Sequence, residues 1–346
     1  MYIKVINCSK IITNASGHVS YSNLLFTYYN YSSIVLSSIS FLLNTLAIFI
    51  FNHRLWRKSL TSIILKYLSV FESLFNATVL IKNSYDNYAI QSKSPNFSSY
   101  ESLLIDETFR LFIRLFGIVF LICRNVTVAV LAAHRYECVC LPVGAKRRIN
   151  SRNVFQIELV IFLLALVIAL PRLFEKYVVA CAEPLWKIEG KVAFLDSSNW
   201  YVYLHKGVVL FIFQSGGPVI TVFILSFYIL QVIKKMKKFR NRNSNNKVRP
   251  QPLGDKIIFP LCLIFFILES PSFFSKILEA YLRSKNLVIV DHTLLVVANI
   301  CIYVDSIINF FIYIISNPTF KLAFVQILKP CFLAKSENVH QTTVIL

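Results

Sequence analysis

Seven long apolar segments constrain this sequence more than any other feature. A helix that crosses a bilayer needs about 20 mostly apolar residues, because its backbone N–H and C=O groups must pair within the helix. No long polar domain separates the segments, and the sequence shows no internal repeat. The sequence therefore predicts an all-α membrane protein built as a seven-transmembrane helix bundle. The predicted helices cover about residues 34–51, 60–82, 108–133, 154–171, 206–233, 257–280 and 288–316.

The predicted bundle, residues 34–316, has a polar segment on each side. Residues 1–33 are expected to form an extracellular N-terminal segment, and residues 317–346 a surface helix followed by a cytoplasmic tail. In "NPTFKLAFVQIL", Phe320, Phe324 and Leu328 recur at every fourth position, which places them on one helix face. This pattern is typical of a short amphipathic helix, an eighth helix lying on the membrane surface.

The charges indicate how the chain crosses the membrane. Charged residues make up 15% of the sequence, against about 25% in soluble domains. With the N-terminus outside, the inner segments hold twenty basic and three acidic residues, and the outer segments nine of each. Basic residues favour the cytoplasmic side. The net charge of +19 is therefore read as a topology signal and as attraction to anionic membrane lipid, not as a nucleic-acid footprint.

Short motifs in six of the segments indicate a protein family. Together they resemble the rhodopsin-like, class A G-protein-coupled receptors, over residues 30–330. The stretches "RYECVCLPVGAK" and "INFFIYIIS" look most like invertebrate FMRFamide-type neuropeptide receptors. The motif residues are Asn44 in "LLNTLAIFIFNHRLWR", Glu72 in "KYLSVFESLF", His134-Arg135-Tyr136 with Pro142, Pro218, Phe265 and Pro271 in "FFILESP", and Asn309 and Tyr313 in "DSIINFFIYIIS".

The resemblance implies a multi-pass plasma-membrane receptor that transduces an extracellular ligand, a neuropeptide above all, to heterotrimeric G proteins. In the family, an arginine at the inner end of helix three covers a closed crevice and is released on activation. Arg135 fills that position, and His134 replaces the acid that holds the arginine. A neutral imidazole holds a guanidinium poorly and a protonated one repels it, so we expect raised basal activity. The residues implied in coupling are His134, Arg135, Tyr136, Pro142, Asn309 and Tyr313.

Charged residues also fall in the middle of the predicted helices. Arg124 lies eleven residues before Arg135, roughly 16 Å along the helix axis. An unpaired charge at this depth costs about 2.5–3.5 kcal/mol. Two readings follow: Arg124 pairs with Glu72 in place of the family's internal sodium ion, or the two face different neighbours and Glu72 is protonated. The expected polar network contains Asn44, Glu72, Arg124, Glu269 and Asp305.

Several positions depart from the family pattern. Glu269 replaces the helix-six tryptophan that serves as a rotamer switch, so the switch either works through a buried acid or is lost. Phe310 replaces the proline of the last helix. The remaining helix-switch residues expected from the resemblance are Phe265, Pro271 and Pro218.

The resemblance places a ligand site between the outer halves of the helices. Acidic side chains there suit an arginine-containing amidated peptide, since guanidinium and carboxylate form strong bidentate pairs. Each of these residues also reads as a solvated loop charge. The candidates are Arg114, Glu175, Glu183, Phe273 and Asp291.

Modification sites are expected at both ends of the chain. Sequons at Asn7, Asn14 and Asn96 fall on the outer side, where glycosylation occurs. The family's helix-three cysteine position falls at Arg110, which leaves Cys181 without its usual partner. Cys181 either bridges to Cys8 or stays a free or intermolecularly paired thiol. Cys331 is either a palmitoylation site or an ordinary tail thiol.

Other function classes find less support. The six histidines form no H-E-x-x-H pattern and no glycine-rich phosphate loop is present, so no enzyme activity, cofactor or metal site is expected. A chemosensory receptor for a small molecule and a divergent receptor that does not signal remain as alternatives. A transporter is least favoured, because it predicts internal repeats and broken helices.

Overall fold

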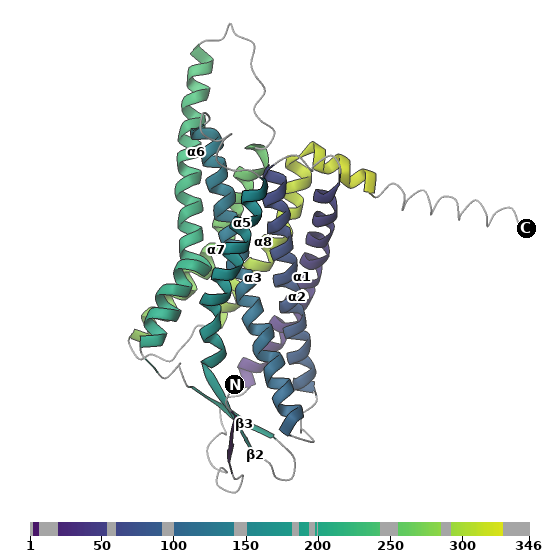
Figure 1. Ribbon diagram of the computed structural model, residues 1–346, viewed down its shortest axis with the longest axis vertical. Coiled ribbons are helices and arrows are strands. Elements are labelled where there is room, and N and C mark those ends of the chain that lie inside the picture. The colour runs from purple at the N-terminus through teal and green to yellow at the C-terminus, as the bar shows by residue number, and fades with distance from the viewer. Residues whose placement is uncertain are drawn as a thin grey trace, which may run out of the picture.

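The computed structural model describes residues 3–6, 20–53, 60–91, 100–141, 151–181, 187–193, 198, 200–242, 255–284 and 292–327. Seven of its helices are long and apolar enough to cross a membrane, which confirms the predicted bundle. They run side by side along the long axis of the molecule (Figure 1). Their bounds are α1 Ser20–Asn52, α2 Leu60–Gln91, α3 Tyr100–Cys140, α5 Ser151–Ala169, α6 Gly217–Arg242, α7 Asp255–Ser284 and α8 His292–Ser316.

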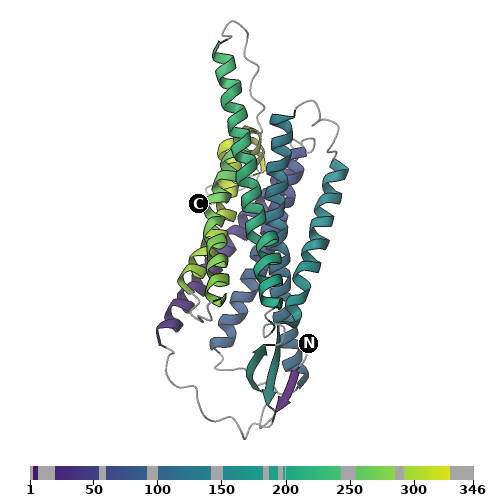
Figure 2. The same ribbon diagram turned by 90° about the vertical axis from the view of Figure 1, so that its left-hand side faces the viewer.

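The third helix stands at the centre of the bundle. It packs against α2, α5, α6 and α7, while α1 packs against α2 and α8. Figure 2 shows α6 running on past the other helices at the end of the bundle away from the strands. Because α3 contacts four helices, polar groups on it can reach most of the bundle.

Two crossings end or begin in a tighter or wider helical turn. The fourth, α5, continues as the 3₁₀ turn η2 (Leu170–Phe174). The fifth begins with two wide π-helical segments, η4 (Tyr201–Val209) and η5 (Phe211–Gly216), before α6. A side chain at Gly217 would place its Cβ 2.1 Å from the backbone oxygen of Ile212, so only glycine allows this close approach. Pro218, which follows, has no N–H to donate to the carbonyl four residues earlier.

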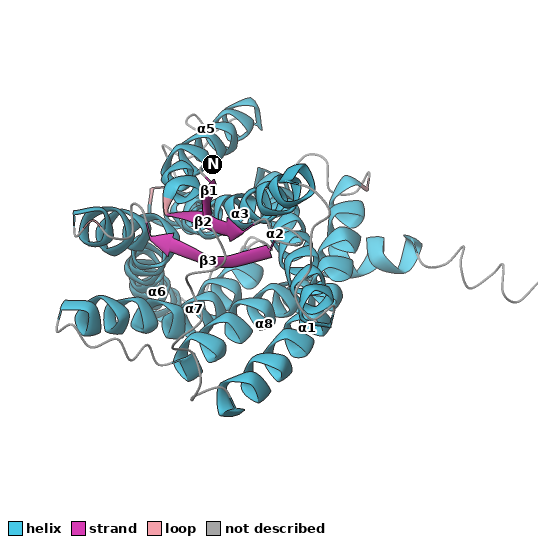
Figure 3. Cartoon of the chain, turned by 90° about the horizontal axis from the view of Figure 1, so that it is seen from below, coloured by secondary structure: helices cyan, strands magenta, loops and turns pink. Residues whose placement is uncertain are grey.

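A small sheet covers one end of the bundle. Its strands are β1 (Ile3–Ile6), β2 (Lys176–Cys181) and β3 (Lys187–Ala193), in the order β1-β2-β3. The second and third strands are antiparallel, and β1 lies parallel to β2 with Ile6 opposite Cys181. Figure 3 looks onto the bundle from this end and shows the sheet lying across it. The sequence analysis named only helices, so these strands are an addition to the predicted fold.

The predicted eighth helix is present at residues 318–327, at the opposite end from the sheet (Figure 1). Asn317 begins it: the Asn317 side-chain oxygen accepts hydrogen bonds from the backbone N–H groups of Thr319 and Phe320, at 2.9 and 3.3 Å. This is a helix N-cap, with Pro318 at the first helical position, where its missing N–H costs nothing.

The apolar face of this helix packs on the bundle itself. Phe320 is fully buried, with its ring centroid 5.2 Å from that of Phe51 and 5.6 Å from that of Tyr313. Phe324 contacts Phe310 of α8. The third predicted member of the face, Leu328, lies outside the described residues. The helix is therefore anchored by aromatic contacts to α1 and α8.

Candidate functional site

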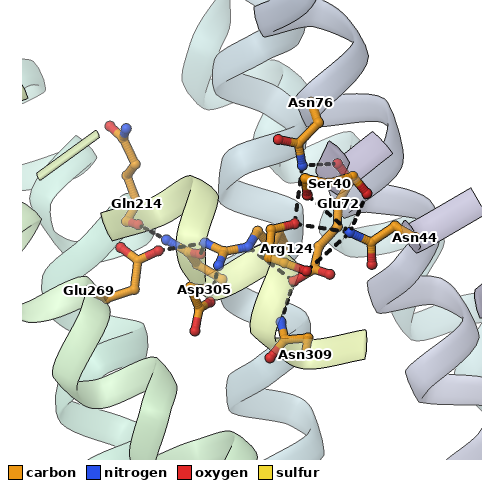
Figure 4. A network of polar contacts seen from close by, with 11 residues as sticks. Ser40, Asn44, Glu72, Asn76, Arg124, Gln214, Glu269, Asp305 and Asn309 are labelled. Atoms are coloured by element: carbon orange, nitrogen blue, oxygen red, sulfur yellow. Dashed lines mark hydrogen bonds and ion pairs between the residues drawn. The ribbon is translucent and has the colours of Figure 1, made fainter. Parts of the chain in front are cut away.

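Arg124 of α3 is the centre of a buried charged cluster that joins four helices (Figure 4). Its Nε lies 3.3 Å from Oε1 of Glu72 on α2, and its Nη1 lies 2.5 Å from Oε1 of Glu269 on α7. Its Nη2 forms an ion pair with Oδ2 of Asp305 on α8. All four side chains are at most 1% exposed. Of the two readings of the sequence, the structure therefore shows the one in which Arg124 and Glu72 are in contact.

Amide side chains extend the cluster toward α1. Asn309 of α8 donates a 2.6 Å hydrogen bond to Oε1 of Glu72. Asn76 of α2 donates to Ser306 Oγ at 3.1 Å, and Asn44 of α1 donates to the same oxygen, also at 3.1 Å. Figure 4 shows these groups on the α1 and α2 side of Arg124. The polar groups of α1, α2 and α8 therefore belong to one hydrogen-bonded network with the charges.

A second branch reaches the fifth crossing. Arg124 Nη1 donates to Oδ1 of Asn125 at 2.9 Å, and Asn125 Nδ2 donates to the backbone oxygen of Gln214 in η5 at 2.6 Å. Neither Asn125 nor Gln214 is among the residues predicted from the sequence. Pro218 was the feature of the sequence that points to Gln214, because the carbonyl four residues before a proline lacks its usual helical donor.

The bilayer explains why these residues converge. A charged side chain facing hydrocarbon is costly, so helices turn such residues to the bundle interior, where they pair. Arg124 offers five N–H donors in a fixed fork, which lets it bind several carboxylates at once. No group of three or more His, Cys, Asp or Glu side chains with a metal-binding arrangement occurs within the described ranges.

The C-terminal end of α3 carries the second group of predicted residues. Arg135 is 7% exposed, and its Nη2 donates a 3.0 Å hydrogen bond to Oγ1 of Thr61 on α2. His134 is buried beside the Cys138 sulfur, one turn along the helix. The ring of Tyr136 meets that of Tyr228 on α6 edge to face, at 6.3 Å. Arg135 is therefore enclosed, and this end of the bundle is closed over it.

Comparison with known proteins places this architecture in a family. Residues 43–313 match the family described as "7 transmembrane receptor (rhodopsin family)". The chain belongs to the rhodopsin family of seven-transmembrane receptors. This is a family of receptors and not of enzymes, and it confirms the resemblance drawn from the motifs.

A curated relative supports the narrower resemblance. The receptor is 27% identical over 203 residues to a protein named "FMRFamide receptor" from Drosophila melanogaster. The aligned stretch covers 56% of this chain and 35% of the relative, so the match spans about a third of that protein's length.

Phe265, one of the residues predicted to act as a helix switch, lies against the cluster. The ring centroid of Phe265, 1% exposed, is 5.9 Å from the guanidinium carbon of Arg124. Pro271 sits inside α7, and Pro218 lies at the start of α6. Phe310 is 3% exposed and packs against Phe320, so it fills the family's proline position with an aromatic contact in an unbroken α8.

The predicted ligand-site residues differ in their surroundings. Glu175 directly follows η2 at the C-terminal end of the fourth crossing. It is buried and accepts a 3.0 Å hydrogen bond from Tyr201, and Lys206 Nζ lies 3.2 Å from its Oε1. Its carboxylate is thus held within the receptor. Arg114 is exposed on α3, and the ring of Phe273 contacts that of Phe211 in η5 at 5.2 Å. The structure does not bring these residues into one group. Glu183 and Asp291 lie outside the described residues.

Most predicted modification sites also lie outside the described residues: Asn7, Asn14, Asn96, Cys8 and Cys331. The predicted coupling residue Pro142 lies outside them as well. Cys181 is described as the last residue of β2.

Arg110, at the family's cysteine position, holds α2 and α3 together by charge. Its Nη1 lies 3.3 Å from Oδ1 of Asp86 on α2, and its Nε lies 3.0 Å from Oδ2 of Asp106. Its guanidinium also lies 4.7 Å from the ring centre of Tyr85. The sequence analysis missed these partners, although Asp106 and Arg110 have the i, i+4 spacing of a helical ion pair.

A further buried acid was also missed. Glu158 of α5 is 2% exposed, and its Oε2 accepts a 2.8 Å hydrogen bond from Thr127 of α3. Its signal was an acid in the middle of the apolar run "FQIELVIFLL". Glu158 is not among the ion-pair partners of Arg124.

Proposed function

We propose that this receptor transduces an extracellular peptide of the FMRFamide type to intracellular heterotrimeric G proteins. The family supports the coarser part, a membrane receptor that couples an outer ligand to a G protein. The peptide class draws support from the stretches that resemble FMRFamide-type receptors and from the named relative.

The observation that carries the proposal is the enclosed state of Arg135. A guanidinium is always charged, and at a helix end of a membrane protein its free energy is lowest when it reaches water. Here it is 7% exposed, and its Nη2 donates a hydrogen bond to the hydroxyl of Thr61. Such a group gains solvation when the inner end opens, which suits a residue released on activation.

We place the receptor in the plasma membrane with the N-terminus outside and the C-terminus in the cytoplasm. The basic inner segments support this orientation. The strand β1 and the helix at 318–327 lie at opposite ends of the bundle, which fits termini on opposite sides of the membrane (Figure 1).

The test is G-protein activation in cells that express the full chain, first without ligand and then against a library of amidated peptides. Arg135→Ala is measured alongside, at matched surface expression. We expect a peptide response that the substitution abolishes. A response to small odorants alone would favour a chemosensory receptor, and silence to both sets would favour a family member that does not signal.

A further inference from the structure

Glu269 connects α7 to the rest of the charged cluster through Arg124. Its Oε1 lies 2.5 Å from Arg124 Nη1, while its Oε2 has no hydrogen-bond partner among the described residues. Glu72 differs, because its Oε1 also accepts from Asn309. The ion pair to Arg124 is therefore the polar contact by which Glu269 holds α7 to α3 (Figure 4).

A proline interrupts the backbone hydrogen bonds of α7 near the same place. Pro271, two residues after Glu269, cannot donate to the carbonyl of Ile267, and proline kinks helices at such points. The side chain of Ser270 donates a 2.8 Å hydrogen bond to that carbonyl instead. A helix with a side-chain bond in place of a backbone bond bends more easily. The ion pair of Glu269 thus lies at a built-in hinge.

The charge balance of the cluster allows Arg124 to lose the Glu269 pair. One guanidinium faces three carboxylates, from Glu72, Glu269 and Asp305. Without the Glu269 pair, Arg124 keeps two carboxylates and is not left as an unpaired buried charge. Without Arg124, all three acids lose their cation, and breaking a buried pair this way is strongly destabilising.

The same arginine also contacts α7 one turn closer to the inner end. The guanidinium of Arg124 faces the ring of Phe265, which is 1% exposed. Arg135 is enclosed in this same structure. The pair between Arg124 and Glu269 therefore belongs to the state in which the inner end is closed.

We propose that the Arg124–Glu269 ion pair is a switch that holds α7 against α3 in the closed state, at the position where the family carries an aromatic residue. Separation of the pair lets the inner half of α7 move out about the hinge at Pro271. The signalling consequence rests on the function proposed above. The movement of α7 does not depend on that function, and it can be measured separately.

Cys262 reports the movement directly. It is a free cysteine on the inner half of α7 and is 3% exposed, so it reacts slowly with a membrane-permeant maleimide while α7 is packed. Cys123 of α3 is also free and fully buried, which makes it an internal control. Labelling of both is followed by peptide mass spectrometry on the intact receptor in membranes.

The test compares Glu269→Gln with the matched control Glu158→Gln, which alters a buried carboxylate outside the cluster. We expect Glu269→Gln to speed Cys262 labelling roughly tenfold, in line with a population shift toward the open state. Cys123 and the control variant should keep wild-type rates. If Glu269→Gln does not reach the membrane, Glu269→Asp replaces it, with a smaller rise expected from its shorter reach.

A wild-type rate of Cys262 labelling in the folded Glu269 variant would overturn the switch. The G-protein assay of the same cells should show raised basal signalling in Glu269→Gln. Faster labelling without any G-protein activation, including by peptide in the wild type, would uphold the switch and count against the proposed function.

Discussion

Asn125 on α3 and Gln214 in η5 are joined by a 2.6 Å hydrogen bond from the Asn125 amide to the Gln214 backbone oxygen. Pro218, four residues after Gln214, has no N–H for that oxygen. The Asn125 oxygen in turn accepts from Arg124. A buried charge on α3 is thereby connected to the backbone of the fifth crossing.

This relationship makes Asn125→Leu a destabilising change. The substitution removes the donor to Gln214 and an acceptor of Arg124, and a buried polar group left unpaired costs about 1–3 kcal/mol. We expect a lower thermal unfolding midpoint in detergent. Thr127→Val is the comparison variant, because it removes one hydrogen bond from α3 to Glu158, whereas Asn125→Leu removes two hydrogen bonds. Equal effects of the two variants would contradict the role given to Asn125.

Arg124→Leu should destabilise the receptor far more than replacement of any single acid of the cluster. It leaves the carboxylates of Glu72, Glu269 and Asp305 without their cation, a loss of about 3–5 kcal/mol by comparison with other buried pairs. Surface expression should therefore fall sharply and recover in part when Glu72→Leu is added. Surface labelling of the two single variants and the double variant measures the coupling. Strictly additive losses would argue that Arg124 and Glu72 act independently.

Several features could be predicted from the sequence because they depend on local composition. Runs of about 20 apolar residues specify the helices, and a charge in mid-helix must face inward. The expected network already contained Glu269 and Asp305 beside Arg124 and Glu72, and the structure brings all four together. Which acid each nitrogen of the guanidinium meets could not be assigned, because it depends on how the helices rotate and tilt. The place of β1 could not be predicted, because β1 and β2 are far apart in the chain and pair only across space.

His134→Asp should lower basal signalling. In the structure Arg135 bonds to Thr61, and His134 lies beside Cys138. A carboxylate next to Arg135 would add an ion pair to the closed state, because guanidinium and carboxylate form strong charge-assisted hydrogen bonds. A several-fold drop in ligand-free G-protein activation is expected, with His134→Asn as the uncharged control. Basal activity that stays the same in His134→Asp would remove the argument.

The surface helix provides the last prediction. Phe320 is fully buried between rings of α1 and α8, and removal of a buried phenylalanine side chain costs about 3–5 kcal/mol. Phe320→Ala should therefore lower the unfolding midpoint strongly, whereas Asn317→Ala, which removes the N-cap, should cost about 1 kcal/mol. Lys321→Ala, on the exposed face of the same helix, should change little. Because Tyr313 packs against Phe320, the larger loss should reach α8, and hydrogen exchange of the inner half of that helix should rise in Phe320→Ala alone. Protection that stays at the wild-type level there would mean that the helix at 318–327 is held by the membrane and not by the bundle.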